Sequence, residues 1–242
     1  TEYKGAKQHL DAGAKRVVIS APAKGDPAES GVTGATVLMG VNDEKLKTCQ
    51  ISSNASCTTN ATSPVIAVLK EAIGIEKAVL NTVHAYTSTQ SLVDGPSKKD
   101  LRRGRAAALN IIPASTGAAQ ATTKAHTELD GKFDGIAIRV PVPVGSIVDV
   151  TFVAKKKTTV EEVNTALRKA AVDPKWKNIF TATDEPIVSS DIIGSRVGSI
   201  ADLGLTRVVD GDLVKVFAWY DNETSYTQTL VEHVSAVAKH LS

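Results

Sequence analysis

Cys57 lies in a sequence whose residue types suit a nucleophilic thiol. Small and hydroxyl residues surround it in the segment SNASCTTN, residues 53–60, where a predicted strand gives way to a predicted helix. Unpaired backbone amides at a helix N-terminus lower the pKa of a thiol and raise its thiolate fraction. A lone cysteine is more often buried and inert, but the polar neighbours on both sides favour the reactive interpretation. The other cysteine, Cys49, lies in an apolar strand context, and there the inert interpretation is preferred.

A thiolate nucleophile also needs a base or an imidazolium partner. His84 follows the apolar run 79–83 at the point where a long polar segment begins, and strand ends are where α/β proteins place functional side chains. Taken alone, His84 would more often be a packing or surface histidine, but together with Cys57 it becomes the expected partner. The other histidines fall on predicted helices: His9, His126, His233 and His240.

Two further features suit the binding of anions. Arg139 lies on a predicted strand between apolar neighbours, where a charge needs a reason to be partly buried, and a phosphate ligand supplies one better than a structural salt bridge does. Residues 115–117 precede a predicted helix, so an anion at its N-terminus is favoured, and an ordinary N-cap is compatible with that role. For Arg102 and Arg103, solvated loop charges are as good an interpretation as any functional one.

The elements that must position these side chains follow from the spacing of apolar residues. The order of the first elements, a helix followed by three strands, suggests part of an α/β sheet domain. Residues 86–110 form a long polar segment with little periodicity, and such segments are usually functional. Helices are predicted at residues 3–12, 61–73, 116–128, 160–171 and 222–241, and strands at 16–20, 36–41, 49–52, 79–83, 135–140, 146–154, 187–189, 207–210 and 214–220.

The composition is that of an ordinary globular protein and excludes several classes. Hydrophobic residues make up 42% of the 242 residues and charged residues 22%, and the net charge of +2 provides no global field for nucleic acid. No apolar stretch is long enough to span a bilayer and no signal peptide is visible at the start, so neither a membrane nor a secreted protein is indicated. The two cysteines do not resemble a disulfide framework, and a cytoplasmic location is expected.

Several long motifs then give the chain a resemblance to a known family. SNASCTTN at 53–60 resembles the nucleophile motif of the glyceraldehyde-3-phosphate dehydrogenase family. The similarity continues through TVHAYT at 82–87, DLRRGRAA at 100–107, IIPASTGAA at 111–119, RVP at 139–141 and WYDNE at 219–223. These motifs stand in the family's order and at its spacing over essentially the whole chain, which makes the resemblance much more specific than one short pattern.

The resemblance implies a role for each matching residue. Cys57 would attack the aldehyde carbonyl, and His84 would keep the thiol ionised and take the hydroxyl proton as hydride leaves, before inorganic phosphate attacks the thioester. The cofactor would be NAD, and no metal is expected. The implied phosphate-binding residues are Ser56, Thr116 and Gly117 for the attacking phosphate and Thr87, Thr89, Arg105 and Arg139 for the substrate's own phosphate, with Thr58 in the same group; Ser20 and Asn222 match contacts to the nicotinamide half of NAD.

The family also implies a fold of mixed α/β and α+β class. Residues 1–55, with the C-terminal helix 223–242, would complete a Rossmann-type nucleotide-binding domain, and residues 56–222 would form a catalytic domain with a mostly antiparallel sheet and helices on one face. The family is homotetrameric, and the segment 86–110 would pack against a neighbour's cofactor site. The family's opening Gly-x-Gly-x-x-Gly loop is not found, so the expectation is a chain that lacks the N-terminal part of the nucleotide-binding domain and binds dinucleotide poorly by itself.

Three other interpretations compete with a glyceraldehyde-3-phosphate dehydrogenase that uses NAD. Erythrose-4-phosphate dehydrogenase shares the cysteine motif, although the intact Ser115-Thr116-Gly117 sequence favours the glyceraldehyde enzyme. A cysteine-dependent acyl hydrolase could use Cys57 and His84 alone, but it would not explain two phosphate sites and Asn222. A non-catalytic binding or scaffold role is the third, and the retention of every matching catalytic residue counts against it.

Overall fold

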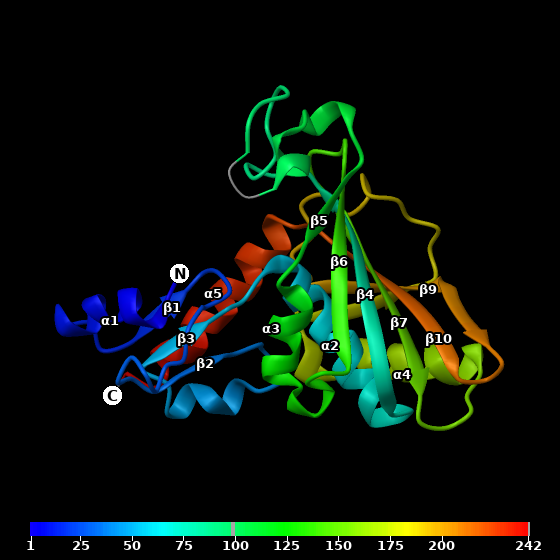
Figure 1. The fold of residues 1–242 in the computed structure, drawn as a ribbon. Coiled ribbons are helices and arrows are strands. Elements are labelled where there is room, and N and C mark those ends of the chain that lie inside the picture. The colour runs from blue at the N-terminus through cyan, green and yellow to red at the C-terminus, as the bar shows by residue number, and fades with distance from the viewer. Residues whose placement is uncertain (98–99, 242) are drawn as a thin grey trace.

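The computed structural model describes residues 1–97 and 100–241, which are arranged around two β-sheets (Figure 1). The larger sheet has seven strands in the order β5-β6-β4-β7-β10-β9-β8. Its pairs are antiparallel except for β4 with β6 and β8 with β9. The strands are β4 (Ile75–Ala85), β5 (Ile112–Ser115), β6 (Phe133–Val140), β7 (Ser146–Ala154), β8 (Phe180–Thr183), β9 (Ser199–Val209) and β10 (Leu213–Tyr220).

The smaller sheet has three parallel strands in the order β1-β3-β2. They are β1 (Val17–Ile19), β2 (Gly34–Thr36) and β3 (Ile51–Ser53). Tyr3 of helix α1 (Tyr3–Asp11) packs against Ile19 and Ile51, and Val237 of α5 (Thr224–Ala238) packs against Val37. Helix α5 thereby lies beside the small sheet, although it follows the last strand of the large one (Figure 1).

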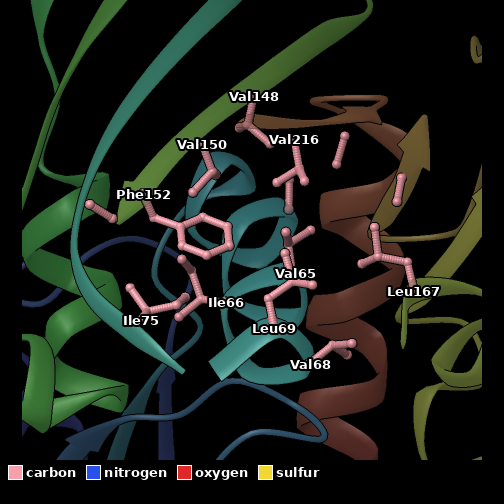
Figure 2. Packing of buried hydrophobic residues seen from close by; sticks show 14 of the residues in the cluster. Val65, Ile66, Val68, Leu69, Ile75, Val148, Val150, Phe152, Leu167 and Val216 are labelled. Atoms are coloured by element: carbon pink, nitrogen blue, oxygen red, sulfur yellow. The ribbon is translucent and has the colours of Figure 1, made fainter. Parts of the chain in front are cut away.

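Three helices cover one face of the large sheet: α2 (Cys57–Ala72), α3 (Ala118–Ala125) and α4 (Val160–Ala171). The apolar side of α2, with Val65, Ile66 and Leu69, meets the buried side chains of the central strands β7 and β10 (Figure 2). Successive side chains in a strand point to opposite faces, and the regular alternation of buried and half-buried residues along β7 follows from this. Short 3₁₀ helices complete the fold: η1 (Asp43–Lys47), η2 (Leu101–Gly104), η3 (Ala107–Leu109), η4 (Thr127–Leu129) and η5 (Pro174–Trp176).

The opposite face of the large sheet mixes exposed apolar side chains with charged ones. Val79 and Ile136 are more than half exposed, and Asp149 and Lys215 form an ion pair there with an Oδ2–Nζ distance of 2.5 Å. These residues line a groove of about 460 Å³. Among the described residues, no helix is long and apolar enough to cross a bilayer.

Most predicted elements are confirmed, β7 and α4 with the same bounds, but two predicted strands are wrong. Residues 37–41 are not a strand, and residues 39–41 form a turn. The Asn42 side chain takes backbone positions that a neighbouring strand would use, because Leu38 N donates to its Oδ1 at 2.8 Å and its Nδ2 donates to Thr36 O at 3.0 Å. Residues 187–189 are likewise not a strand and lead into a turn that begins at residue 189, where Val188 N donates to Asp191 Oδ2 at 2.7 Å. The short strands β5 and β8 were not predicted. The predicted C-terminal helix ends at Ala238, and residue 242 lies outside the described residues.

Candidate active site

The loop that follows β3 places Cys57 at the first position of α2. Ser56 is the N-cap of that helix, and Thr59 N donates to its Oγ at 3.2 Å. Ala55 is fully buried with φ of +54°, a left-handed conformation that costs free energy for a residue other than glycine and that is typical of functional turns. The thiol is therefore set at a helix N-terminus by a tight, strained turn.

His84 faces this thiol from the end of β4. Its Nε2 lies 3.4 Å from Cys57 Sγ. Residues 78, 80, 82 and 84 of β4 point to the helix-covered face of the sheet, and α2 packs on that face. The pairing of a helix N-terminus with a strand end thus brings together two residues that are 27 positions apart in the sequence.

Arg139 completes a triplet with these two residues. In the parallel register of β4 and β6 it is the direct partner of His84, so both side chains emerge on the same face. Its Nη1 lies 2.8 Å from His84 Nδ1 and donates to Ala85 O at 2.9 Å. Its Nε is buried and without a partner, and no carboxylate lies within ion-pair distance of it in residues 1–97 and 100–241. Arg139 is thus a partly buried cation that offers a position to an anion.

Burial decides the protonation of the pair. It raises the pKa of the Cys57 thiol, against the lowering effects of the Thr58 backbone and hydroxyl hydrogen bonds and of the Arg139 charge. The sequence predicts a pKa lowered by the helix N-terminus; that influence is present but weaker than desolvation. Burial, followed by the positive charge of Arg139, lowers the pKa of His84 to about 4. With no anion bound, Cys57 and His84 are therefore a neutral thiol and a neutral imidazole at neutral pH.

Tyr220 forms the floor of the site. It is fully buried, and its hydroxyl lies 2.9 Å from Thr58 Oγ1 and 2.8 Å from Thr82 Oγ1. Its ring meets that of His84 edge-on, with centroids 5.8 Å apart. The Thr58 side chain, which the sequence predicts to contact substrate, contacts the Tyr220 hydroxyl in this floor. Sequence reasoning missed Tyr220, whose signal was only its neighbourhood in WYDNE.

Asn222 joins the site through β7. Gly145 N donates to its Oδ1 at 3.1 Å, and the hydroxyl of Ser146 donates to the same atom at 3.2 Å. The Ser146 hydroxyl in turn accepts a hydrogen bond from Ala85 N, 3.1 Å away. The Asn222 amide is therefore oriented by the two hydrogen bonds that its Oδ1 accepts, and its Nδ2 is the atom that can donate. Through Ser146 it is also linked to the end of β4, which carries His84.

Hydroxyl groups that the sequence predicts to bind phosphate lie just after β4 and at the start of α3. Thr87 and Thr89 follow β4 directly, with their Oγ1 atoms 2.9 Å apart. Thr116 caps the start of α3 through its Oγ1, which accepts from Ala118 N at 3.1 Å, and Gly117 is the N-cap residue. A Cβ at Gly117 would meet nothing within 4 Å, so open space lies in front of this helix N-terminus.

Of the three arginines in DLRRGRAA, the structure directs Arg103 toward the site. Its Nη2 donates to Ser115 O at 3.2 Å, and its charge reinforces the lowering of the Arg139 pKa, which is caused mainly by burial. Arg105, the predicted phosphate ligand, instead pairs with Asp94, with an Nε–Oδ2 distance of 3.1 Å and a side chain that is 58% exposed. Sequence reasoning missed Arg103 because adjacent arginines in a loop give no signal of which one points inward.

Ser20 lies exposed where β1 ends. Since β1 and β3 are parallel, this end is the same sheet edge from which the Cys57 loop departs. Ser53 at that edge donates through its hydroxyl to Ala21 O at 2.7 Å. The carboxyl edge of a parallel sheet is where α/β proteins bind dinucleotides.

Helix α5 holds the nucleophile loop from behind through Tyr226, Thr229 and His233, the α5 clamp. Tyr226 donates through its hydroxyl to Ala55 O at 3.2 Å, and Asn54 Nδ2 donates to Thr229 Oγ1 at 3.3 Å. His233 Nδ1 lies 3.2 Å from Asn54 Oδ1, and its Nε2 lies 2.7 Å from Ser52 Oγ. Burial lowers the pKa of His233 to about 4, so its ring is neutral.

Comparisons with known proteins identify the family. The family model "Glyceraldehyde 3-phosphate dehydrogenase, C-terminal domain" matches residues 56–222. Proteins named glyceraldehyde-3-phosphate dehydrogenase are similar over nearly the whole chain. The one from Mycobacterium tuberculosis is 51% identical over 98% of this chain and 67% of its own length. Those from Clostridium acetobutylicum and Geobacillus stearothermophilus are each 48% identical, over 99% and 98% of this chain and 70% and 69% of their own lengths. The chain therefore belongs to the glyceraldehyde-3-phosphate dehydrogenase family.

Proposed function

We propose that this chain carries out the phosphorylating oxidation of D-glyceraldehyde 3-phosphate to 1,3-bisphosphoglycerate, with reduction of NAD, as a step of glycolysis. The observation that carries the proposal is the triplet of Cys57, His84 and Arg139: a thiol 3.4 Å from an imidazole nitrogen, beside a cation without a carboxylate partner in the described chain. A nucleophile, a base and an anion site are what acyl transfer to phosphate requires.

The reaction proceeds in steps in which the residues below move each proton. Cys57 Sγ attacks the aldehyde carbon as its proton passes to the new oxygen, and a thiohemiacetal results. His84 Nε2 then accepts the hydroxyl proton as the carbon loses hydride. NAD, when bound, supplies the hydride acceptor. The product is a thioester on Cys57. A phosphate oxygen attacks it, the C–S bond breaks, and Cys57 leaves as the thiolate and recovers the proton from His84.

We assign the phosphate groups to the polar residues around the triplet. Thr87, Thr89 and Arg139 would bind the substrate's own phosphate, and Ser56, Thr116 and Gly117 the attacking one. Guanidinium forks suit both groups. The contact of Arg103 with Ser115 O favours Arg103 as the second cation, in place of Arg105.

We propose that Asn222 and Ser20 face the nicotinamide half of NAD, where an amide and a hydroxyl suit a carboxamide and a ribose. Asn222 has its amide oriented by Gly145 and Ser146, and Ser20 stands at the carboxyl edge of the parallel sheet. We propose that residues 1–55 and the helix 223–242 belong to the dinucleotide-binding domain and residues 56–222 to the catalytic domain. The contacts of α5 with the small sheet support that division.

We also propose a homotetramer in the cytoplasm, as the family implies. The groove on the uncovered face of the large sheet supports this assembly, with exposed Val79 and Ile136 beside the Asp149–Lys215 pair. Asn81 Oδ1, on the same face, is buried without a partner among the described residues, and a neighbouring subunit could supply a donor.

The thioester half of the reaction tests the proposal without dinucleotide. The protein is incubated with 1,3-bisphosphoglycerate and radiolabelled phosphate, and label entering the acyl phosphate is measured. Exchange is expected in the wild type and in Cys49→Ser, and not in Cys57→Ser. Hydrolysis of the acyl phosphate without exchange would instead indicate the cysteine-dependent hydrolase.

The complete reaction is followed as NADH formation with glyceraldehyde 3-phosphate and phosphate. Erythrose 4-phosphate in place of the triose separates the neighbouring activity. A higher kcat/KM for erythrose 4-phosphate would overturn the substrate assignment, while the exchange result would still report on the thioester chemistry.

A further inference from the structure

We propose that Gln90 sets the charge preference for the tail of the substrate. Its neutral amide, held against the hydroxyls of Thr87 and Thr89, suits a phosphorylated aldehyde, and a carboxylate in its place would exclude one. The proposal rests on the proposed function, because that function assigns these two hydroxyls to the substrate's own phosphate. Gln90 is a positioning residue, since it acts on the phosphate through the hydroxyls and through its lack of charge.

Gln90 closes the turn that follows β4. Its backbone N donates to Thr87 O at 3.0 Å, and Thr87 N donates back to its side-chain Oε1 at 3.0 Å. A backbone N–H can only donate, so the oxygen of the amide and not its nitrogen must face Thr87. Gln90 is 8% exposed, whereas Thr87 is half-buried and Thr89 is exposed. The turn therefore presents the two hydroxyls to solvent and keeps the amide behind them.

The amide oxygen and the two hydroxyls form a triangle of oxygens. Gln90 Oε1 lies 3.4 Å from Thr87 Oγ1 and 3.3 Å from Thr89 Oγ1, and the two hydroxyl oxygens are 2.9 Å apart. The hydroxyls can donate to Oε1 only over these long distances, at which a hydrogen bond is weak. A phosphate oxygen accepts a shorter and stronger bond. Both hydroxyls can therefore turn to a phosphate at little cost, while the Thr87 N–H continues to satisfy the amide oxygen.

The amide nitrogen of Gln90 takes no part in this turn. Its Nε2 is buried and has no hydrogen-bond partner among the described residues. All the contacts that the side chain makes in the turn use its single oxygen, which a carboxylate would supply equally well. What glutamine offers here beyond glutamate is therefore its neutrality.

The charge at this position matters because the position is close to the phosphate. A phosphate oxygen bound to either hydroxyl would lie within about 6 Å of Gln90 Oε1, one hydrogen bond beyond the hydroxyl. Two like charges at this distance near a protein surface repel strongly enough to change a binding constant by roughly a hundredfold. The charged side chains that the structure directs toward the site, Arg103 and Arg139, are both cations. A neutral residue at position 90 adds no negative charge that would oppose their attraction for the phosphate.

The test compares a charged aldehyde with an uncharged one and needs no dinucleotide. Formation of the thiohemiacetal protects Cys57 from iodoacetamide, so alkylation of its peptide, measured by mass spectrometry, reports the binding of D-glyceraldehyde 3-phosphate or of D-glyceraldehyde. The measurement is made at about pH 8, where the phosphate monoester is a dianion. The wild type should be half-protected at a lower concentration of the phosphorylated aldehyde. Gln90→Glu should raise that concentration at least about tenfold and leave the value for D-glyceraldehyde nearly unchanged.

Two further variants separate the charge from the fold of the turn. Gln50→Glu is the matched control, because Gln50 Oε1 accepts from Thr33 N at 3.0 Å and lies 3.4 Å from Thr33 Oγ1, which is the same arrangement at the start of β3. It should behave like the wild type with both aldehydes. Gln90→Met removes the acceptor without adding a charge, and it should keep the preference for the phosphorylated aldehyde.

Several results would overturn the proposal. They are a wild type that does not prefer the phosphorylated aldehyde, a Gln90→Glu protein that keeps the preference or binds both aldehydes equally less well, and a Gln90→Met protein that loses the preference as fully as Gln90→Glu. If the preference responds as stated but no label enters 1,3-bisphosphoglycerate, the role of Gln90 stands and the proposed function fails. If label exchanges while Gln90→Glu keeps the preference, the proposed function stands and the role of Gln90 fails.

Discussion

Replacing His233 by alanine tests whether the α5 clamp activates the thiol. His233 is fully buried, and its two ring nitrogens satisfy Ser52 Oγ at 2.7 Å and Asn54 Oδ1 at 3.2 Å. Alanine leaves both partner groups buried and unsatisfied, at a cost of about 1–3 kcal/mol each. The free energy of unfolding should therefore fall by roughly 2–6 kcal/mol, a large part of the 5–15 kcal/mol typical of a domain.

The second effect of His233→Ala should be on Cys57. Asn54 precedes the strained Ala55 in the loop that ends at Cys57. When Asn54 loses its contact with His233, we expect this loop to shift and the Thr58 N–H to move away from Cys57 Sγ. Losing a hydrogen bond to the charged sulfur costs about 1.5–3 kcal/mol. That corresponds to alkylation by iodoacetamide roughly ten- to a hundredfold slower below the thiol pKa.

The assay combines urea unfolding, followed by circular dichroism, with alkylation rates across a pH series under native conditions. Val237→Ala is the matched control, because Val237 lies on the same helix and packs on Val37 and Leu46 without touching the nucleophile loop. It should lower the urea midpoint and leave the alkylation profile unchanged. If His233→Ala alkylates like the wild type while folded, or if Val237→Ala shifts the profile equally, the clamp does not act on the thiol.

Three further predictions use single side chains. Burial lowers the pKa of His126 to about 4, below the 6.5 of an unfolded chain, so the unfolded state binds the proton first. The contribution of His126 to the free energy of unfolding is therefore complete above about pH 6.5 and falls toward pH 4, by up to about 3 kcal/mol. Neither ring nitrogen has a partner among the described residues, so His126→Leu should raise the urea midpoint near pH 5. An unchanged midpoint would contradict this prediction. Gly135→Ala would place a Cβ 2.5 Å from Leu80 O and should cost about 1–3 kcal/mol in urea unfolding, whereas a cost near zero would show that β4 and β6 can separate freely. Arg103→Ala should raise the phosphate concentration that gives half-maximal acyl exchange at least about tenfold, as loss of one charge-assisted bond implies. Arg105→Ala should leave that concentration nearly unchanged, and the reverse order of the two variants would restore Arg105 to the site.

Local pattern accounts for what the sequence predicted well. Helix α4 has a strong apolar period and a capping box in which Glu162 N donates to Thr159 Oγ1 and Thr159 N to Glu162 Oε2. Both features depend on residues close together in the sequence, so they can be predicted without knowledge of the tertiary structure. Cys57 and His84 were also predicted from local pattern, because Cys57 stands where a helix begins and His84 stands near the end of a strand whose apolar run is clear.

The parts that the sequence did not predict depend on distant contacts. Residues 37–41 have strand-forming residues, but the Asn42 side chain binds their backbone. The choice between Arg103 and Arg105 depends on which face of a loop meets Ser115. The pKa of Cys57 could not be predicted from its helix position, since burial by residues far along the chain outweighs the amides beside it.

The α5 clamp also bears on how the chain acquires its reactivity during synthesis. The contacts of Tyr226 with Ala55 and of His233 with Ser52 join residues 171 and 181 positions apart. A ribosome extends the chain in order, so Cys57 emerges long before α5 exists to hold its loop, and contacts of such separation close late in folding. Throughout that interval the thiol is an ordinary cysteine on an unsecured turn. The docking of α5 is then the event that fixes the nucleophile loop of a newly made chain and so holds Cys57 in the position that the folded site requires.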